Sequence, residues 1–78
     1  MGKITGRYKV VFRMVNGLKH NPQVSEGPFI ISKPLGTLYN ISEVDAYEVR
    51  GEWIAIVFEG KKGYVRVSKG SEVFLRKL

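Results

Sequence analysis

The sequence predicts an all-β domain, built as a small antiparallel barrel of five to six short strands. Nine Gly and three Pro interrupt the 78 residues, and apolar side chains often recur at every second position. The longest run without Gly or Pro covers only residues 37–50, so almost no helix fits. Short strands joined by frequent turns are typical of small barrels.

The first predicted strand starts at Arg7, where apolar and polar side chains alternate with a period of two. One face carries Tyr8, Val10, Phe12 and Met14, and the other carries Arg7, Lys9, Val11 and Arg13. This pattern predicts a strand with a basic outer face. Residues 1–6 before it are expected to form a tail or an extension of the strand.

Residues 15–29 are predicted to form one long structured loop. The dipeptides Asn16-Gly17, Asn21-Pro22 and Gly27-Pro28 are turn signals, and they follow one another too closely for a regular element. Long loops in small domains often carry function. We therefore expect residues 15–28 to form one wall of a ligand groove.

The second half of the chain predicts the remaining strands. A short strand covers residues 35–39, and residues 42–50 fit either a strand, which we favour, or a two-turn helix with a capping box. The six apolar residues 53–58 predict a strand covered on both faces, with Ile54, Ile56 and Phe58 in the core. A tight hairpin then leads into a strand over residues 64–67, and a last strand follows at 73–75.

Composition limits the possible functions. Residues 1–78 suffice for a single domain, and no apolar run resembles a bilayer-spanning segment or a signal peptide. The absence of Cys and the single His exclude disulfides, thiolate chemistry and most zinc sites, so neither a cofactor nor a metal is expected. The net charge of +6 suits an anionic partner, although it also suits a small soluble domain with no such partner.

Catalytic residues are not evident. His20 and Asp45 are the only imidazole and the only aspartate, and they are predicted to lie in different parts of the fold. The glutamates are scattered, and residues 59–63 join two strands without the helix that a phosphate-binding loop needs. The sequence therefore predicts a binding domain and not an enzyme.

From residue 15 to residue 75 the sequence resembles the bacterial SH3 (SH3b) domain of cell-wall hydrolases and phage endolysins. Gly36-Thr37-Leu38 resembles the family's GTL element, and the segment from Trp53 to Val65 is similar to its W-Y-x-I-x-Y and G-x-x-G-Y-V signature. Residues 17–23 are similar to its N-V-R-S-G-P-S loop. Residues 24–35 are longer than the family's linker, and Ala55 and Val57 replace outer-face residues that are commonly polar.

The resemblance implies an SH3-like barrel and a non-catalytic module that binds the cell wall. Such a module recognises a peptidoglycan peptide or an anionic wall polymer and tethers an adjacent catalytic domain to its substrate. It would work outside the cell or in the cell wall, after export or phage lysis, without insertion into a membrane. The ligand-binding residues predicted for this chain are Tyr8, Asn16, Lys19, His20, Asn21, Tyr39, Trp53, Lys62, Tyr64 and Arg66.

Several of these residues have a second interpretation. His20 could be a solvated loop residue, Tyr64 could pack at the barrel rim, and Trp53 could be half-buried core. Lys62, Tyr64 and Arg66 share one strand face, which also suits stacking on the bases of a nucleic acid. A third hypothesis is a structural domain that associates with itself or a partner through a Trp53, Ala55 and Val57 face.

Overall fold

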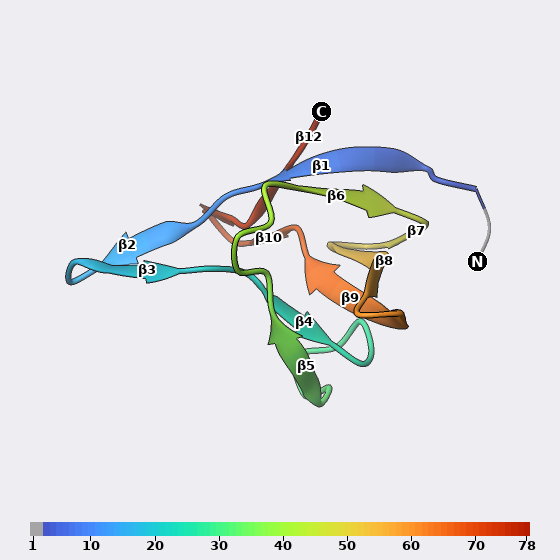
Figure 1. The fold of residues 1–78 in the computed structure, drawn as a ribbon, viewed down its shortest axis with the longest axis horizontal. Coiled ribbons are helices and arrows are strands. Elements are labelled where there is room, and N and C mark those ends of the chain that lie inside the picture. Colours follow the sequence, from blue (N-terminus) through green and yellow to red (C-terminus); the bar gives the residue numbers. More distant parts are fainter. Residues whose placement is uncertain (1–2) are drawn as a thin grey trace.

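The computed structural model describes residues 3–78, which form short antiparallel strands and no helix (Figure 1). The strands are β1 (Gly6–Val10), β2 (Arg13–Val15), β3 (Leu18–His20), β4 (Gln23–Ser25), β5 (Pro34–Thr37), β6 (Glu43–Ala46), β7 (Glu48–Arg50), β8 (Trp53–Phe58), β9 (Lys61–Arg66), β10 (Ser68–Lys69), β11 (Glu72–Val73) and β12 (Leu75–Lys77). No helix within residues 3–78 has the length and apolar character needed to cross a membrane.

The strands form two main sheets and two separate hairpins. One sheet has five strands in the order β5-β4-β9-β8-β7, and the other has three in the order β12-β1-β6. β2 pairs only with β3, and β10 only with β11. The prediction of an all-β antiparallel fold is confirmed. The twelve strands outnumber the expected five to six, and no closed barrel is found among residues 3–78.

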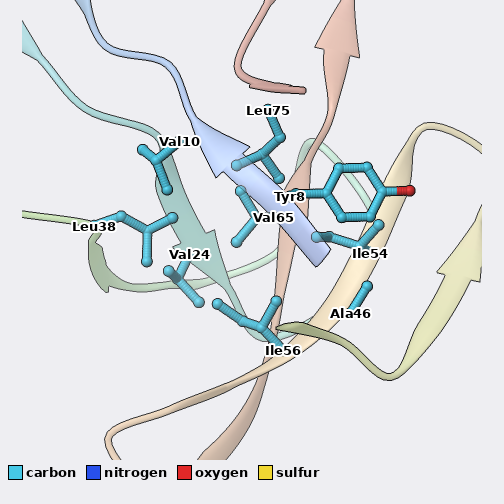
Figure 2. Close-up of a cluster of buried hydrophobic side chains, with 9 residues drawn as sticks. All are labelled: Tyr8, Val10, Val24, Leu38, Ala46, Ile54, Ile56, Val65 and Leu75. Atoms are coloured by element: carbon cyan, nitrogen blue, oxygen red, sulfur yellow. The ribbon is translucent and has the colours of Figure 1, made fainter. Parts of the chain in front are cut away.

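The inner faces of the two sheets enclose one apolar core. Its members are Tyr8, Val10, Val24, Leu38, Ala46, Ile54, Ile56, Val65 and Leu75 (Figure 2). Eight of them come from strands of the two sheets, where alternate residues point inward, and Leu38 directly follows β5. At Gly63 a Cβ atom would lie 2.5 Å from the Cγ1 atom of Val24, so β4 can pack against β9 only because residue 63 is a glycine.

The first strand ends earlier than its sequence pattern predicts. Tyr8 and Val10 are buried, but β1 ends at Val10, and Phe12 and Met14 are exposed. The β2–β3 hairpin extends away from both sheets (Figure 1), so these two side chains lie outside the core, with the Lys19 ammonium 4.3 Å from the centre of the Phe12 ring. The inward face predicted for residues 7–14 is therefore wrong beyond Val10.

The prediction of one long loop over residues 15–29 is wrong. Asn16 and Gly17 have φ angles of 51° and 78° and form the tight turn between β2 and β3. β4 lies between β5 and β9, with Val24 fully buried. These strands have three residues each, too few to show a period of two between turn signals.

Most of the later elements agree with the prediction, but β9 begins at Lys61, three residues before the predicted start, and the last strand predicted at residues 73–75 is divided between β11 and β12. Residues 43–50 form β6 and β7 and no helix, and β8 covers the predicted residues 53–58. Ala55, on the outer face of β8, is buried, although the prediction placed it on an exposed surface with Trp53 and Val57. It is 0% exposed because it lies between the larger Glu48 and Tyr64 of the neighbouring strands, so it cannot contribute to an exposed Trp53, Ala55 and Val57 surface.

Candidate functional site

A groove of about 340 Å³ lies on the outer side of the five-stranded sheet, at the Trp53 end of β8. We call it the basic groove. The β2–β3 hairpin supplies Arg13 and His20, and the loop after β4 supplies Ile30. The remaining lining residues are Asn21, Pro22, Gln23, Ser25, Trp53, Val65, Arg66, Lys69 and Phe74. Segments from across the chain therefore build this one site.

Two of the cations in the basic groove are held in place by carboxylates at its edge. Arg13 pairs with Glu72 at 3.1 Å, and the Arg66 Nη2 atom pairs with Glu52 at 2.8 Å. The Arg66 Nε–H also donates to the Ser68 carbonyl oxygen at 2.9 Å. Arg66 is thus fixed at two points, which lowers the entropy that a ligand contact would cost.

Lys69 differs from the two arginines, because it takes part in no ion pair among residues 3–78. It lies beside the β10–β11 turn and is exposed. A lysine that no carboxylate already occupies is free to meet an incoming anion. It therefore supplies the cation in the groove that is open to a ligand.

Trp53 supplies the aromatic surface of the groove. It is half-buried, and the Arg66 guanidinium carbon lies 5.8 Å from the centre of its ring. Phe74 lines the same groove, and Gln23, Asn21 and His20 add groups that can hydrogen-bond. The groove thus combines cations, ring faces and polar side chains, which suits an extended ligand with anionic and polar groups.

The predicted face of Lys62, Tyr64 and Arg66 exists, but its tyrosine is not accessible. Tyr64 is only 7% exposed, and the Lys62 ammonium lies 5.2 Å from the centre of its ring. The pKa of Lys62 is raised by Tyr64 and then by Glu48, whose carboxylate lies 3.3 Å away. These contacts within the chain leave no free ring face at Tyr64 on which a base could stack.

The structure brings only part of the predicted site together. His20, Asn21, Trp53 and Arg66 line the basic groove. Tyr8 lies in the core (Figure 2), and Tyr39 lines a second groove at the other end of β8. The other predicted residues, Asn16, Lys19, Lys62 and Tyr64, line neither groove.

Some residues of the basic groove were missed by the sequence analysis. Gln23 and Ser25 were placed in a loop, whereas β4 holds them beside β9. Lys69 and Phe74 reach the groove through the β10–β11 hairpin, and the only signal for that hairpin was the Gly70-Ser71 turn. Arg13 was noted only for the charge of the first strand.

The side chains of the basic groove can bind a ligand, but they do not bring together the His20 and Asp45 that a Ser/His/Asp arrangement would need. His20 lies in the basic groove, while Asp45 lines the second groove and accepts a hydrogen bond from Arg7 at 3.0 Å. Within residues 3–78, no group of three His, Cys, Asp or Glu side chains could hold a metal ion.

Comparisons with known proteins find no matching family model, no similar curated protein and no similar solved structure.

Proposed function

We propose that this chain is a non-catalytic module that binds an anionic polymer of the bacterial cell wall in the basic groove. The observation that supports this most is that cations from three different strands line one groove together with the only tryptophan of the chain: Arg13 from β2, Arg66 from β9 and Lys69 from β10. We propose further that the two sheets form an SH3-like arrangement of the SH3b kind, as the sequence resemblance implies. The module would tether a separate hydrolase domain to the wall.

The chemistry of the groove supports this proposal. Wall polymers carry phosphates or carboxylates along a flexible chain of sugars and peptides, and the arginine fork matches both anions. Trp53 provides a flat apolar face for a sugar ring, and Gln23 and Asn21 provide groups for amides and hydroxyls. The net charge of +6 raises the rate of encounter with any polyanion.

Nucleic acid is the second candidate, because the same cations could bind its phosphates. The aromatic surface available to bases is reduced, since Tyr64 is buried and the two rings that line the groove, Trp53 and Phe74, are half-buried. Stacking on successive bases normally uses several accessible rings. A wall polymer needs fewer ring contacts for each unit, so the geometry favours it.

Trp53 provides the test, because it is the only tryptophan in the chain and lines the groove. Purified Gram-positive cell walls should sediment the domain at low salt, and soluble teichoic acid should change the Trp53 fluorescence. With three phosphate contacts, affinity should fall about 20- to 40-fold between about 50 and about 200 mM salt. A domain that stays in the supernatant at low salt contradicts the proposal.

A pair of charge-matched variants locates the binding site. Lys69→Gln should weaken teichoic acid binding about fivefold, as expected for one lysine near a polyanionic surface. Lys61→Gln removes the same charge from an exposed lysine outside both grooves, and it should change affinity less than twofold. Equal losses would show that only net charge matters. Tighter binding of a single-stranded oligonucleotide than of teichoic acid would favour the second candidate.

A further inference from the structure

A second groove, of about 460 Å³, lies at the Phe58 end of β8, and its charge is opposite to that of the chain as a whole. We call it the acidic groove. Three of the seven Asp and Glu residues line it, namely Glu43, Asp45 and Glu59. No lysine or arginine is among its lining residues. On a domain with a net charge of +6, this is a local reversal of sign.

The carboxylates of this groove are only partly neutralised. Arg7 serves two of them, with its Nε atom 3.0 Å from Asp45 and its Nη1 atom 3.6 Å from Glu43. Glu59 is exposed and takes part in no ion pair among residues 3–78. Two of the three carboxylates therefore share one guanidinium and the third has no ion-pair partner among residues 3–78, so the lining of the groove keeps a surplus of negative charge.

Aromatic and apolar side chains line the rest of the acidic groove. Tyr39 is 65% exposed, and Tyr47 and Phe58 are half-buried. Ile41 and Val57 add exposed apolar surface. Ring faces next to carboxylates attract an organic cation, through cation–π contact as well as through charge. The volume lies within the range of sites that hold a small ligand or a side chain with its backbone.

We propose that the acidic groove binds an extended peptide segment of a partner protein and accepts one of its lysine or arginine side chains. The apolar stem of such a side chain would lie along Ile41 and Val57, with its charged head at Glu59 and Tyr39. A small inorganic cation would leave the rings and the apolar surface unused. This interaction goes beyond wall binding and does not depend on it, because the two grooves share no lining residue.

The test uses a minimal probe, an N-acetylated and C-amidated Gly-Lys-Gly peptide, titrated into the full ¹⁵N-labelled chain. We expect saturable chemical-shift changes at the amides of residues 39–41 and 57–60, with Trp53 fluorescence unchanged. The same peptide with norleucine in place of lysine keeps the stem but lacks the ammonium group, so it should bind at least fivefold more weakly. Equal binding of the norleucine peptide would overturn the proposal, as would shift changes centred on the basic groove.

Variants with a matched control complete the test. Glu59→Gln and Tyr39→Ala should each weaken the lysine peptide about two- to fivefold, and together by about 4- to 25-fold. Glu26→Gln removes one exposed carboxylate that lines neither groove, so it should leave peptide affinity unchanged. An equal loss in Glu26→Gln would show that only overall charge matters and would overturn the proposal. Teichoic acid binding should stay unchanged in all three variants, which separates this result from the test of the basic groove.

Discussion

The two grooves occupy opposite ends of β8 and carry charges of opposite sign, and in each groove ion pairs within the chain neutralise only part of that charge. In the basic groove, Glu52 and Glu72 each hold an arginine, and Lys69 remains unpaired among residues 3–78. In the acidic groove, Arg7 pairs with two carboxylates, and Glu59 has no ion-pair partner in the described part of the chain, residues 3–78. Each groove thus keeps one open charge next to a tight hairpin turn.

The separation along β8 keeps the two charges apart. Trp53 and Phe58 are five positions apart, which corresponds to about 17 Å along a strand. That distance is about two Debye lengths at physiological salt, so each groove acts on its own ligand with little influence from the other. Opposite ligands can therefore be bound by one small sheet, provided that the core beneath holds both grooves in shape.

The largest expected effect comes from that shared core. Ile54→Ala should destabilise the domain by about 2–5 kcal/mol, because Ile54 is fully buried and the cavity left behind cannot be filled. A domain of this size has a total stability of only about 5 kcal/mol, so both ligands should be lost together. Urea unfolding followed by Trp53 fluorescence measures the change.

Val49→Thr provides the control, because Val49 pairs with Ile54 across β7 and β8 but is exposed. It should change stability by no more than about 0.5 kcal/mol. An Ile54→Ala domain that keeps one ligand and loses the other would mean that the two ends fold independently.

A smaller effect is expected at the turn beside the acidic groove. Glu59 and Gly60 have φ angles of 50° and 79°, close to those of Asn16 and Gly17 in the β2–β3 turn. Asn tolerates this left-handed conformation better than Glu does. Glu59→Asn should therefore stabilise the domain by up to about 1 kcal/mol while weakening the lysine peptide, as a thermal melt and the peptide titration would show.

Glu59→Gln separates these two effects, because it removes the charge and keeps a side chain that is ill suited to the turn. It should weaken the peptide without raising the melting temperature. If Glu59→Asn binds the peptide as tightly as the original chain, the carboxylate of Glu59 has no part in binding. The acidic groove would then need another explanation.

The sequence predicts β8 and the presence of a hairpin after it, because their signals are local, although β9 begins at Lys61, inside the predicted connection. Six apolar residues and a Gly-rich turn lie within one short segment, and the strand follows directly from them. The grooves depend instead on pairing between distant segments. Arg7 meets Asp45 only because β1 pairs with β6, and periodicity within either segment does not indicate that pairing.

The order of charged residues along the sequence also does not indicate which charges lie together in the folded chain. The first strand was predicted to have a basic outer face, but the charge of Arg7 on that face is neutralised by Glu43 and Asp45. Conversely, Lys69 is one of thirteen lysine and arginine residues with nothing in its neighbours to distinguish it. It becomes part of a site only when β10 and β11 bring it beside Trp53 and Arg66.

The smallest expected effect concerns Glu48, which lines neither groove. Its side chain pairs with Arg50 and with Lys62, and these hydrogen bonds hold the pKa of Glu48 below its ordinary value. A carboxylate whose pKa is lower in the folded state than in the unfolded state stabilises the fold above the unfolded pKa. That contribution is lost as the pH falls through the folded pKa. Glu48 should therefore contribute a small loss of stability that begins between about pH 5 and pH 4 and continues at lower pH.

Glu48→Gln should remove that part of the acid dependence and slightly lower stability at neutral pH, because Arg50 and Lys62 lose their partner. Urea unfolding at a series of pH values measures both changes, with Glu26→Gln as a control outside any ion pair among residues 3–78. Both exposed ion pairs are screened by solvent, so the change is expected to be small. Neither ligand should lose affinity at neutral pH. A loss of affinity at either groove would mean that the ion pairs of Glu48 with Arg50 and Lys62 couple the two ends of β8. The two grooves would then have to be treated as one site.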